Sequence, residues 1–354
     1  MTALGEYFRQ RGVATCGVAP GITTPAHFSS ADTEHLATRR TCGLFDFSFM
    51  ACVEIRGVQS LDFLHRLQTR NLARLAHGHI AYTLMLRADG TVLNDATVWR
   101  FAEGYFALFM GRRSDLAHVR AVSRGFDVTL TERSDDHAVL AVQGPNAWQT
   151  LTRCIGDAPR DLPYFGFWPA SFQGAPCWIA RIGYSGETGY EIILGAAHAP
   201  ALWRALHAAG ATECGFEAIN SLRIEAGHVL FSAELARPVT PAILGLSRLV
   251  DTYVIDFIGN INSHKQPFLE RYRGLLIDRM PAGADAGALI GVFQGARITS
   301  ACRSPILQRT IALGFVAAEH AAPGTRLRLA ASLTATVARL PFYDPAKHLA
   351  RRTR

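Results

Sequence analysis

The chain has 354 residues, and at about 100–200 residues per domain this length predicts two or three domains. With 49% hydrophobic and 18% charged residues, the composition is typical of a folded globular protein and excludes a disordered chain. The formal net charge is +7, but the basic residues are dispersed, so we expect no nucleic-acid partner, whereas a small anionic ligand stays compatible with the charge.

Membrane, disulfide and metal signals are also missing from the sequence. No apolar run reaches the about 20 residues of a membrane-spanning helix, and the first residues do not resemble a secretory signal. The seven cysteines are odd in number and none forms a C-x-x-C pair, which argues against a disulfide framework and a zinc site. We therefore predict a cytoplasmic protein with no membrane association and no metal.

The first half of the chain predicts helices and strands in alternation. A serine cap at Ser60 and leucines three residues apart indicate a short helix, and Asp89-Gly90 marks a hairpin turn. The predicted elements are a helix over residues 30–40, a strand over 46–56, a helix over 60–69, a hairpin with strands 82–86 and 91–101, and a strand over 105–110.

The second half changes character after Pro267. Before it, the patterns predict a glycine-rich hairpin over residues 177–194 and helices over 200–209 and 217–226. After it, short strands are predicted over residues 274–277, 288–293, 311–316, 327–330 and 334–340. This pattern predicts a small all-β C-terminal domain, either a barrel or a sandwich.

Asp95 is unusual because aspartate is disfavoured inside strands. Strand alternation puts it on one face with Leu93, Thr97, Trp99 and Phe101. Such a carboxylate is either paired, exposed at an edge, or held in a pocket of low dielectric. In a pocket, desolvation raises the carboxyl pKa and suits the group to proton transfer.

The segment GYSGETGYE, residues 183–191, is the second candidate. Its three glycines allow tight turns and a close approach of the backbone to a ligand. Tyr184 and Tyr190 could stack on a flat ring, and Glu187 and Glu191 could accept hydrogen bonds from it. A glycine-rich hairpin with packed tyrosines would produce the same pattern, and the spacing is not that of a dinucleotide-binding loop.

Ordered motifs over residues 41–343 resemble the glycine-cleavage T-protein family, the tetrahydrofolate-dependent aminomethyltransferases. GYSGETGYE is similar to the family's G-Y-T-G-E-x-G-[FY]-E, and TVLNDATVW resembles its G-x-x-D-D segment. Further similar segments are CGLFDFSFM, LAVQGPNA, LRIEAG, FIGN and LPFYDP.

The resemblance implies an α+β fold in which three domains form a cloverleaf-like ring around a central folate site. We expect residues 1–50 and 135–250 to form a folate-binding first domain. Residues 51–134 would form an α+β second domain, and residues 268–345 a C-terminal β-barrel.

The resemblance also implies site residues. The essential family aspartate falls on Asp95, while the aspartate before it is Asn94 here, and the glutamate that holds the pterin falls on Glu191. Further cofactor-binding positions fall on Met50, Tyr82, Tyr164 and Tyr184, and on Trp99, where the family has tyrosine. The implied cofactor is tetrahydrofolate or its 5-methyl or 5,10-methylene form.

Departures from the family pattern gather on the substrate side. Five positions differ from the family pattern. A histidine, an arginine, an aspartate, a tyrosine and a tryptophan of the family are replaced here, in that order, by Phe49, Ile219, Asn220, His228 and Arg248. Lysine, a common docking charge, occurs only at Lys265 and Lys347. We therefore expect a small-molecule donor or acceptor of the one-carbon unit and disfavour a lipoyl carrier protein as partner.

These observations predict a tetrahydrofolate-dependent methyl, methylene or aminomethyl transferase in which Asp95 is the acid/base or electrostatic catalyst. The alternative is a folate-binding protein without catalytic activity that serves in regulation or assembly. The direction of transfer and the oxidation level of the one-carbon unit stay open.

Overall fold

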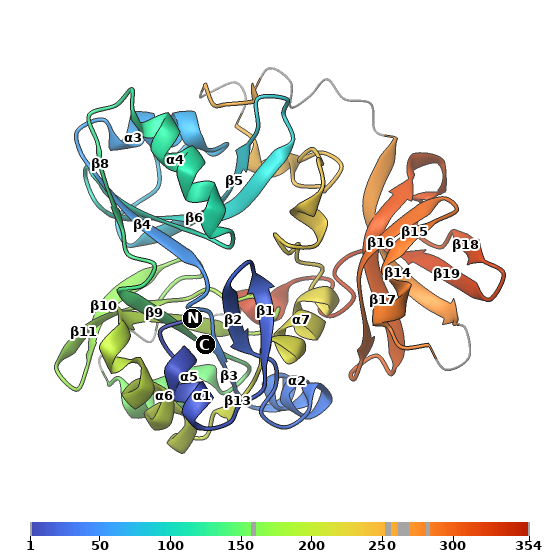
Figure 1. Cartoon of the computed structure of the whole chain (residues 1–354), viewed down its shortest axis with the longest axis horizontal. Helices are drawn as coiled ribbons and strands as arrows, with labels where there is room; N and C mark the ends of the chain where they lie inside the picture. Colours follow the sequence, from blue (N-terminus) through green and yellow to red (C-terminus); the bar gives the residue numbers. More distant parts are fainter. Residues whose placement is uncertain (1, 157–160, 252–255, 261–268, 281–283, 353–354) are drawn as a thin grey trace.

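The computed structural model describes residues 2–156, 161–251, 256–260, 269–280 and 284–352. In these ranges the strands form three large sheets and one two-stranded hairpin. Figure 1 shows each large sheet in a lobe of its own, with the C-terminal lobe beside the other two. Helices and mostly antiparallel sheets are mixed, which confirms the predicted α+β class.

The first sheet is assembled from distant parts of the chain. Its strands pair antiparallel except for β13, which runs parallel to β3. Their order is β10 (Phe167–Phe172), β11 (Ala175–Ala180), β12 (Gly189–Gly195), β9 (His137–Gln143), β3 (Gly43–Asp46) and β13 (Thr212–Glu213).

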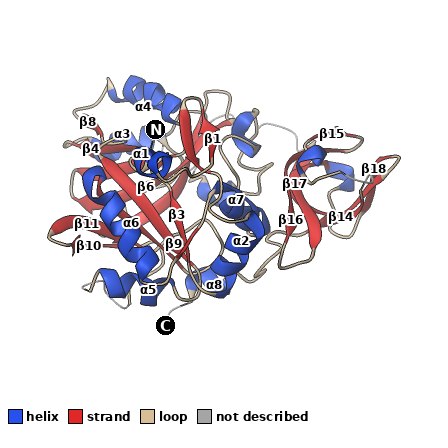
Figure 2. Ribbon diagram, turned by 60° about the horizontal axis from the view of Figure 1, so that its bottom comes forward, coloured by secondary structure: helices blue, strands red, loops and turns tan. Residues whose placement is uncertain are grey.

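Helices enclose this sheet on one face and leave the other for the site. Phe8 and Trp203 join the core on the covered face, where the helices are α1 (Gly5–Gln10), α5 (Ala147–Cys154) and α6 (Ala199–Ala208). Helices α2 (Ala31–Arg40) and α7 (Phe216–Glu225) lie side by side next to it, as Figure 2 shows. A hairpin of β1 (Thr15–Ala19) and β2 (Ile22–Pro25) completes this part.

The second sheet is antiparallel throughout. Its strands are β5 (His79–Leu86), β6 (Val92–Ala102), β7 (Tyr105–Met110), β4 (Ala51–Arg56) and β8 (Thr129–Glu132), in that order. Helices α3 (Ser60–Leu67) and α4 (Leu116–Ser123) pack on it through Phe63, Leu64 and Val119. The predicted hairpin around Asp89-Gly90 is therefore present as β5 and β6.

The third sheet is a curled antiparallel sheet near the C-terminus. Its order is β15 (Gly291–Phe293), β16 (Ala296–Ser304), β17 (Arg309–Ala317), β14 (Glu270–Arg279), β19 (Leu333–Ala338) and β18 (Arg326–Ala330). Tyr272 and Phe315 pack against Leu84 and Ile224, so this sheet shares a core with both other lobes. The short helix α8 (His348–Arg351) lies near the C-terminus.

One predicted strand was wrong, and several elements were not predicted, among them α1, α4, α5, β8, β9, β10 and β16. The strand predicted over residues 46–56 is two strands in different sheets, because the Asp46 carboxylate accepts the backbone N–H of Ser48 and turns the chain between β3 and β4. Strand β16 was missed because its mixed polar and apolar sequence lacks a clear alternation. The domain boundaries at residues 50, 134, 250 and 268 stay a prediction.

Candidate functional site

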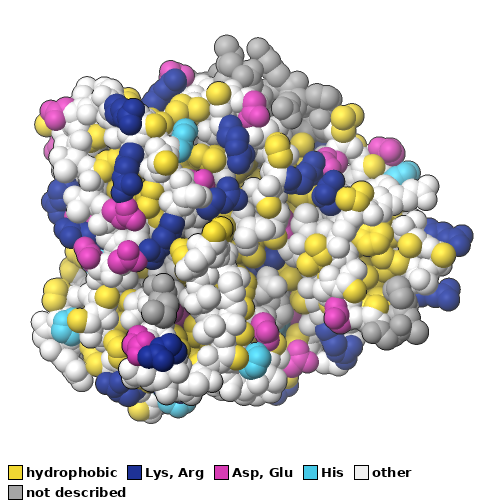
Figure 3. Space-filling model, viewed as in Figure 1, with side chains coloured by type: hydrophobic (Ala, Val, Ile, Leu, Met, Phe, Trp, Pro, Cys, Tyr) yellow, Lys and Arg dark blue, Asp and Glu magenta, His cyan; other side chains and the backbone are white. Residues whose placement is uncertain are grey.

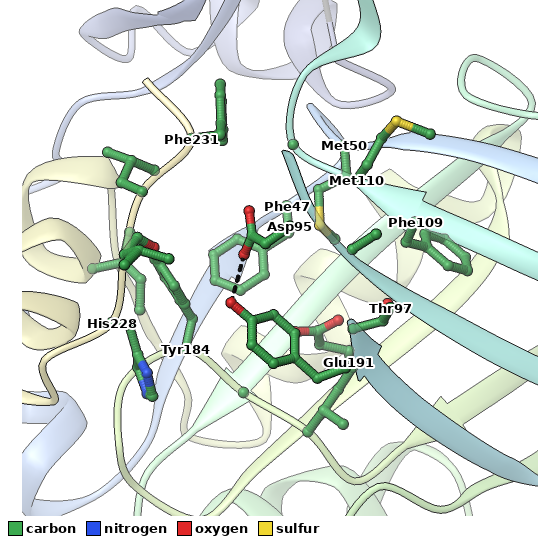
Figure 4. A pocket seen from close by; sticks show the side chains of 18 of the residues that line it. Phe47, Met50, Asp95, Thr97, Phe109, Met110, Tyr184, Glu191, His228 and Phe231 are labelled. Atoms are coloured by element: carbon green, nitrogen blue, oxygen red, sulfur yellow. Dashed lines mark hydrogen bonds between the residues drawn. The ribbon is translucent and has the colours of Figure 1, made fainter. Parts of the chain in front are cut away.

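A cavity of about 220 Å³ lies between the first and second sheets and takes its walls from both. Apolar side chains make most of its surface, and Figure 4 shows the polar groups that point into it. The polar lining side chains are Tyr82, Asp95, Thr97, Tyr164, Tyr184, Glu191 and His228. The cavity therefore combines an apolar interior with two carboxyl groups.

Asp95 reaches the cavity from the middle of β6. Tyr82 on β5 pairs with Thr97 on β6, so Tyr82 and Asp95 are diagonal neighbours on the same face of the sheet. The Tyr82 hydroxyl donates a hydrogen bond of 2.9 Å to Oδ2 of Asp95, drawn as the dashed line in Figure 4. This contact fixes the carboxylate in the cavity.

The pKa of Asp95 is raised above its ordinary value. Desolvation among the surrounding side chains is the largest cause, and the hydrogen bond from Tyr82 and the charge of Arg112 oppose it. A raised pKa makes the Asp95 carboxylate a stronger base than an exposed aspartate, which suits it to proton transfer. The interpretation of Asp95 as a pocket carboxylate rather than an exposed one therefore agrees with the structure.

Glu191 is the second carboxyl group of the cavity and lies in the middle of β12. Its strand neighbours are Ala141 and Ala180, whose small side chains leave its carboxyl group unobstructed. Burial raises its pKa to about 8, and no ion pair or hydrogen bond to its side chain occurs among the described residues. A buried carboxyl group without a partner is costly, so it points to a ligand that supplies donors.

Packing requires two of the three glycines in the glycine-rich segment, and one of them, Gly183, also lines the cavity. A Cβ on Gly183 or Gly189 would collide with the side chain of Gln143, at 2.0 Å and 2.4 Å. Glu187 pairs with Arg39 at 3.0 Å, away from the cavity, and Tyr190 packs against Trp148 in the first sheet's core. Of the four side chains considered in this segment, only Tyr184 and Glu191 line the cavity.

Tyr184 and His228 form one corner of the cavity. Their rings stack with 5.6 Å between centroids and 15° between planes, and the Tyr184 hydroxyl donates to the carbonyl of Val229. Burial, helped by the charges of Lys347, Arg223 and Arg39, lowers the pKa of His228 to about 4. At neutral pH this corner is therefore uncharged.

An aromatic wall, formed by Phe47, Phe49, Phe216 and Phe231, closes the cavity on another side. The ring centroid of Phe49 lies 6.0 Å from that of Phe47, 6.2 Å from that of Phe216 and 6.5 Å from that of Phe231. Phe47 and Phe49 belong to the turn between β3 and β4. The turn at residues 47–50, which divides the strand predicted over residues 46–56, therefore contributes part of the aromatic wall.

The predicted site residues separate into two groups. The cavity is lined by the predicted catalytic and cofactor-binding residues Met50, Tyr82, Asp95, Tyr164, Tyr184 and Glu191. It is also lined by three of the substrate-side candidates, Phe49, Ile219 and His228. Trp99, Asn220 and Arg248 do not line it.

Each of these three exceptions has a local cause. The Trp99 ring packs 5.0 Å from the rings of Phe109 and Phe167, behind the wall that Thr97 forms. Asn220 accepts a hydrogen bond from Arg223, and the side chain of Arg248 is exposed.

Sequence reasoning missed most of the apolar lining. Five apolar residues line the cavity although none was predicted as a site residue: Phe47, Phe216, Val229, Leu230 and Phe231. Apolar residues in a cavity have the same pattern along the chain as apolar residues in a core, so the sequence carried no signal for them. Phe101 was predicted on the same strand face as Asp95, but it does not line the cavity. Its ring stacks on that of Tyr105 instead.

Two further observations concern the described part of the chain. None of its helices has the length and apolar character needed to cross a membrane. Within the same residues, no three His, Cys, Asp or Glu side chains gather in an arrangement that could hold a metal ion.

Sequence comparison relates almost the whole chain to one family. The family model described as GCVT N-terminal domain matches residues 5–253, and the one described as glycine cleavage T-protein C-terminal barrel domain matches residues 272–344. The aminomethyltransferase of Streptomyces avermitilis is 34% identical over 341 residues, covering 92% of this chain and 91% of the relative. That of Methylococcus capsulatus is 35% identical and covers 84% of each chain.

The fold agrees with this relationship. The crystal structure of the glycine cleavage system aminomethyltransferase T from Bartonella henselae has a TM-score of 0.84 to this chain at 27% identity, covering 97% of this chain and 98% of that one. The similarity confirms the predicted T-protein-like fold with its C-terminal barrel. The chain therefore belongs to the glycine cleavage T-protein family of aminomethyltransferases.

Proposed function

We propose that this protein is a tetrahydrofolate-dependent one-carbon transferase that acts on a small molecule, with Asp95 as its acid/base or electrostatic catalyst. The observation that carries the proposal is the Asp95 carboxyl group in an apolar cavity, hydrogen-bonded to Tyr82 and accompanied by Glu191, which has no partner in the part of the chain that the structure describes. Similarity to aminomethyltransferases over more than 90% of the chain supports the reaction class.

The cavity residues fit a reduced pterin. Tyr184 and Tyr164 offer aromatic surface to a flat ring system, and Met50 offers a polarisable thioether. The N–H and NH2 groups of a pterin would supply the donors that Glu191 lacks among the described residues. Tetrahydrofolate, or its 5-methyl or 5,10-methylene form, is the cofactor that this combination favours.

In the proposed mechanism the chain's own residues hold the reactants and move one proton. When bound, tetrahydrofolate supplies the ring nitrogen that takes up or gives up the one-carbon unit. The Asp95 carboxylate takes a proton from this nitrogen or returns one to it, while Tyr82 keeps the carboxylate oriented. The aromatic wall excludes water, which strengthens the electrostatic effect of Asp95.

The partner in this proposal is a small donor or acceptor rather than a lipoyl carrier protein. Phe49 and Ile219 give the substrate side of the cavity an apolar surface where the resemblance leads us to expect a histidine and an arginine. The small cavity volume, about 220 Å³, also favours a compact reactant.

The test uses Asp95→Asn, which keeps the shape of the side chain but cannot accept a proton. We expect turnover to be lost while the affinity for tetrahydrofolate, measured by calorimetry, stays within about tenfold of wild type, or ~1.4 kcal/mol. Full activity of the variant would refute the role of Asp95.

Thermal unfolding decides between the proposal and its alternative. A reduced folate that binds the folded protein must raise its melting temperature. Folate binding without any transfer to a panel of methylated amines, ethers and thioethers would favour the non-catalytic folate-binding protein. The lack of a thermal shift with every reduced folate would exclude both functions.

A further inference from the structure

The cavity around Asp95 combines aromatic rings with a lining that carries no lysine or arginine side chain. Figure 4 shows Phe47 and Phe231 around Asp95 in the cavity. The cavity lining, all of which lies in the described residues, contains no lysine and no arginine. His228, its only histidine, is uncharged at neutral pH because its pKa lies near 4.

Two arginines whose charges act on cavity residues are held by contacts within the protein. Arg112 donates to the carbonyl oxygens of Phe231, Leu235 and Leu93 at distances between 2.6 and 3.4 Å. Arg223 donates to Glu234 at 2.9 Å and to the carbonyl oxygen of His228 at 3.1 Å. Both guanidinium groups are therefore held by other parts of the protein, and neither belongs to the cavity lining.

Two consequences follow for a ligand next to Asp95. A carboxylate or phosphate would be buried there without a cation, which is strongly unfavourable. A cation would lie among aromatic rings and beside the Asp95 carboxylate, and aromatic rings bind quaternary ammonium groups in other proteins. A cation would also favour the ionised form of Asp95, which is the form that can accept a proton.

We infer that the one-carbon donor of this protein is a small methylated cation, a quaternary ammonium or sulfonium compound without a carboxylate or phosphate, which binds against the aromatic wall. The inference rests on the proposed transferase function and assigns it a donor class and a direction.

The chemistry of such a donor balances without an oxidant or reductant. The bond between the methyl carbon and the donor's nitrogen or sulfur breaks, and its electron pair stays on that atom, which becomes neutral. The methyl carbon forms a new bond to a ring nitrogen of tetrahydrofolate, and the proton displaced from this nitrogen passes to Asp95. The positive charge thus leaves the donor as the proton reaches the carboxylate.

The experiment compares three probes of similar size on the full chain saturated with tetrahydrofolate. Choline carries the cation, 3,3-dimethyl-1-butanol is its neutral isostere, and glycine betaine adds a carboxylate. By calorimetry we expect choline to bind at least about tenfold more tightly than either of the other two. This comparison needs no variant, so it does not depend on whether a mutated protein folds.

Variants then locate the cation. Phe49→Leu and Phe231→Leu keep apolar volume but remove a ring, and we expect each to reduce choline binding more than binding of the neutral isostere. Phe293→Leu, in the C-terminal sheet and outside the cavity lining, is the matched control and should leave both affinities unchanged.

The outcomes separate this inference from the proposed function. Equal affinity for choline and its neutral isostere, equal affinity for betaine, or no choline binding at all would each overturn the inference. In all three cases tetrahydrofolate binding would still support the proposed function, which fails separately if tetrahydrofolate does not raise the melting temperature.

Discussion

Replacement of Glu191 by glutamine should stabilise the ligand-free protein while it weakens folate binding. In the unfolded chain Glu191 loses its proton near its ordinary pKa of 4.5, whereas in the folded chain burial raises the pKa to about 8. Between these values folding takes up a proton, so a rise in pH weakens the fold by about 1.4 kcal/mol per pH unit. At pH 7 the raised pKa of Glu191 therefore lowers the free energy of unfolding by about 3 kcal/mol.

The Glu191→Gln variant has no such cost because its amide does not ionise. We expect it to be about 3 kcal/mol more stable than wild type at pH 7 and less than about 1 kcal/mol more stable at pH 5. Urea unfolding of both proteins without ligand at the two pH values measures the difference. A gain that is the same at both pH values, or a loss of stability at pH 7, would refute the reasoning.

Glu225→Gln is the matched control. Burial opposes the ionisation of Glu225, but its hydrogen bond with His35 and the charge of Arg39 outweigh burial and lower its pKa. Arg39 donates to this carboxylate at 2.7 Å. Its replacement leaves buried cationic charge less compensated, so this variant should lose stability under the conditions in which Glu191→Gln gains it.

Three further variants probe how the site is built. Tyr82→Phe removes the hydrogen bond that lowers the pKa of Asp95, so the acidic limb of the pH–rate profile should move to higher pH. Gly111→Ala brings a Cβ within 2.1 Å of the Phe231 ring, which should raise KM for the donor and cost about 1–3 kcal/mol of stability in urea unfolding. Arg223→Met leaves a buried carboxylate unpaired and should cost about 3–5 kcal/mol by the same measurement.

For each of these three variants, one experimental result would contradict the predicted effect. An unchanged pH profile of Tyr82→Phe would show that the hydroxyl does not influence Asp95. Wild-type stability and KM of Gly111→Ala would mean that Phe231 can move at no cost. Arg297→Met, at an exposed position of β16, should change stability by less than about 0.5 kcal/mol, and an equal loss in both arginine variants would contradict the role of the buried pair.

Much of the local structure could be predicted because its causes lie close together in the chain. The hairpin of β5 and β6 follows from Asp89-Gly90 between two apolar runs, and helix α2 follows from the Ser30 cap, whose side chain accepts the N–H of Thr33. Asp95 stood out for a similar reason, as a charged residue inside a strand pattern.

Other features depend on residues far apart in the chain. Gly183 lines the cavity, but it must be a glycine because a Cβ there would collide with the side chain of Gln143, forty residues earlier. Trp99 shares its strand with Asp95, yet Phe109 and Phe167 cover its ring. No local pattern records which distant side chain occupies the neighbouring space.

The sequence by itself determined many of the elements, the family and the charged groups of the site, because turn chemistry, strand alternation and ordered motifs are local properties. Only the tertiary structure decided that Glu191 has no partner among the described residues, that Arg112 and Arg223 are held by other protein groups, and that four phenylalanines line the same cavity as Asp95. The reason is physical: desolvation, pairing and packing depend on which atoms lie within a few ångströms, and these contacts exist only once the chain has folded.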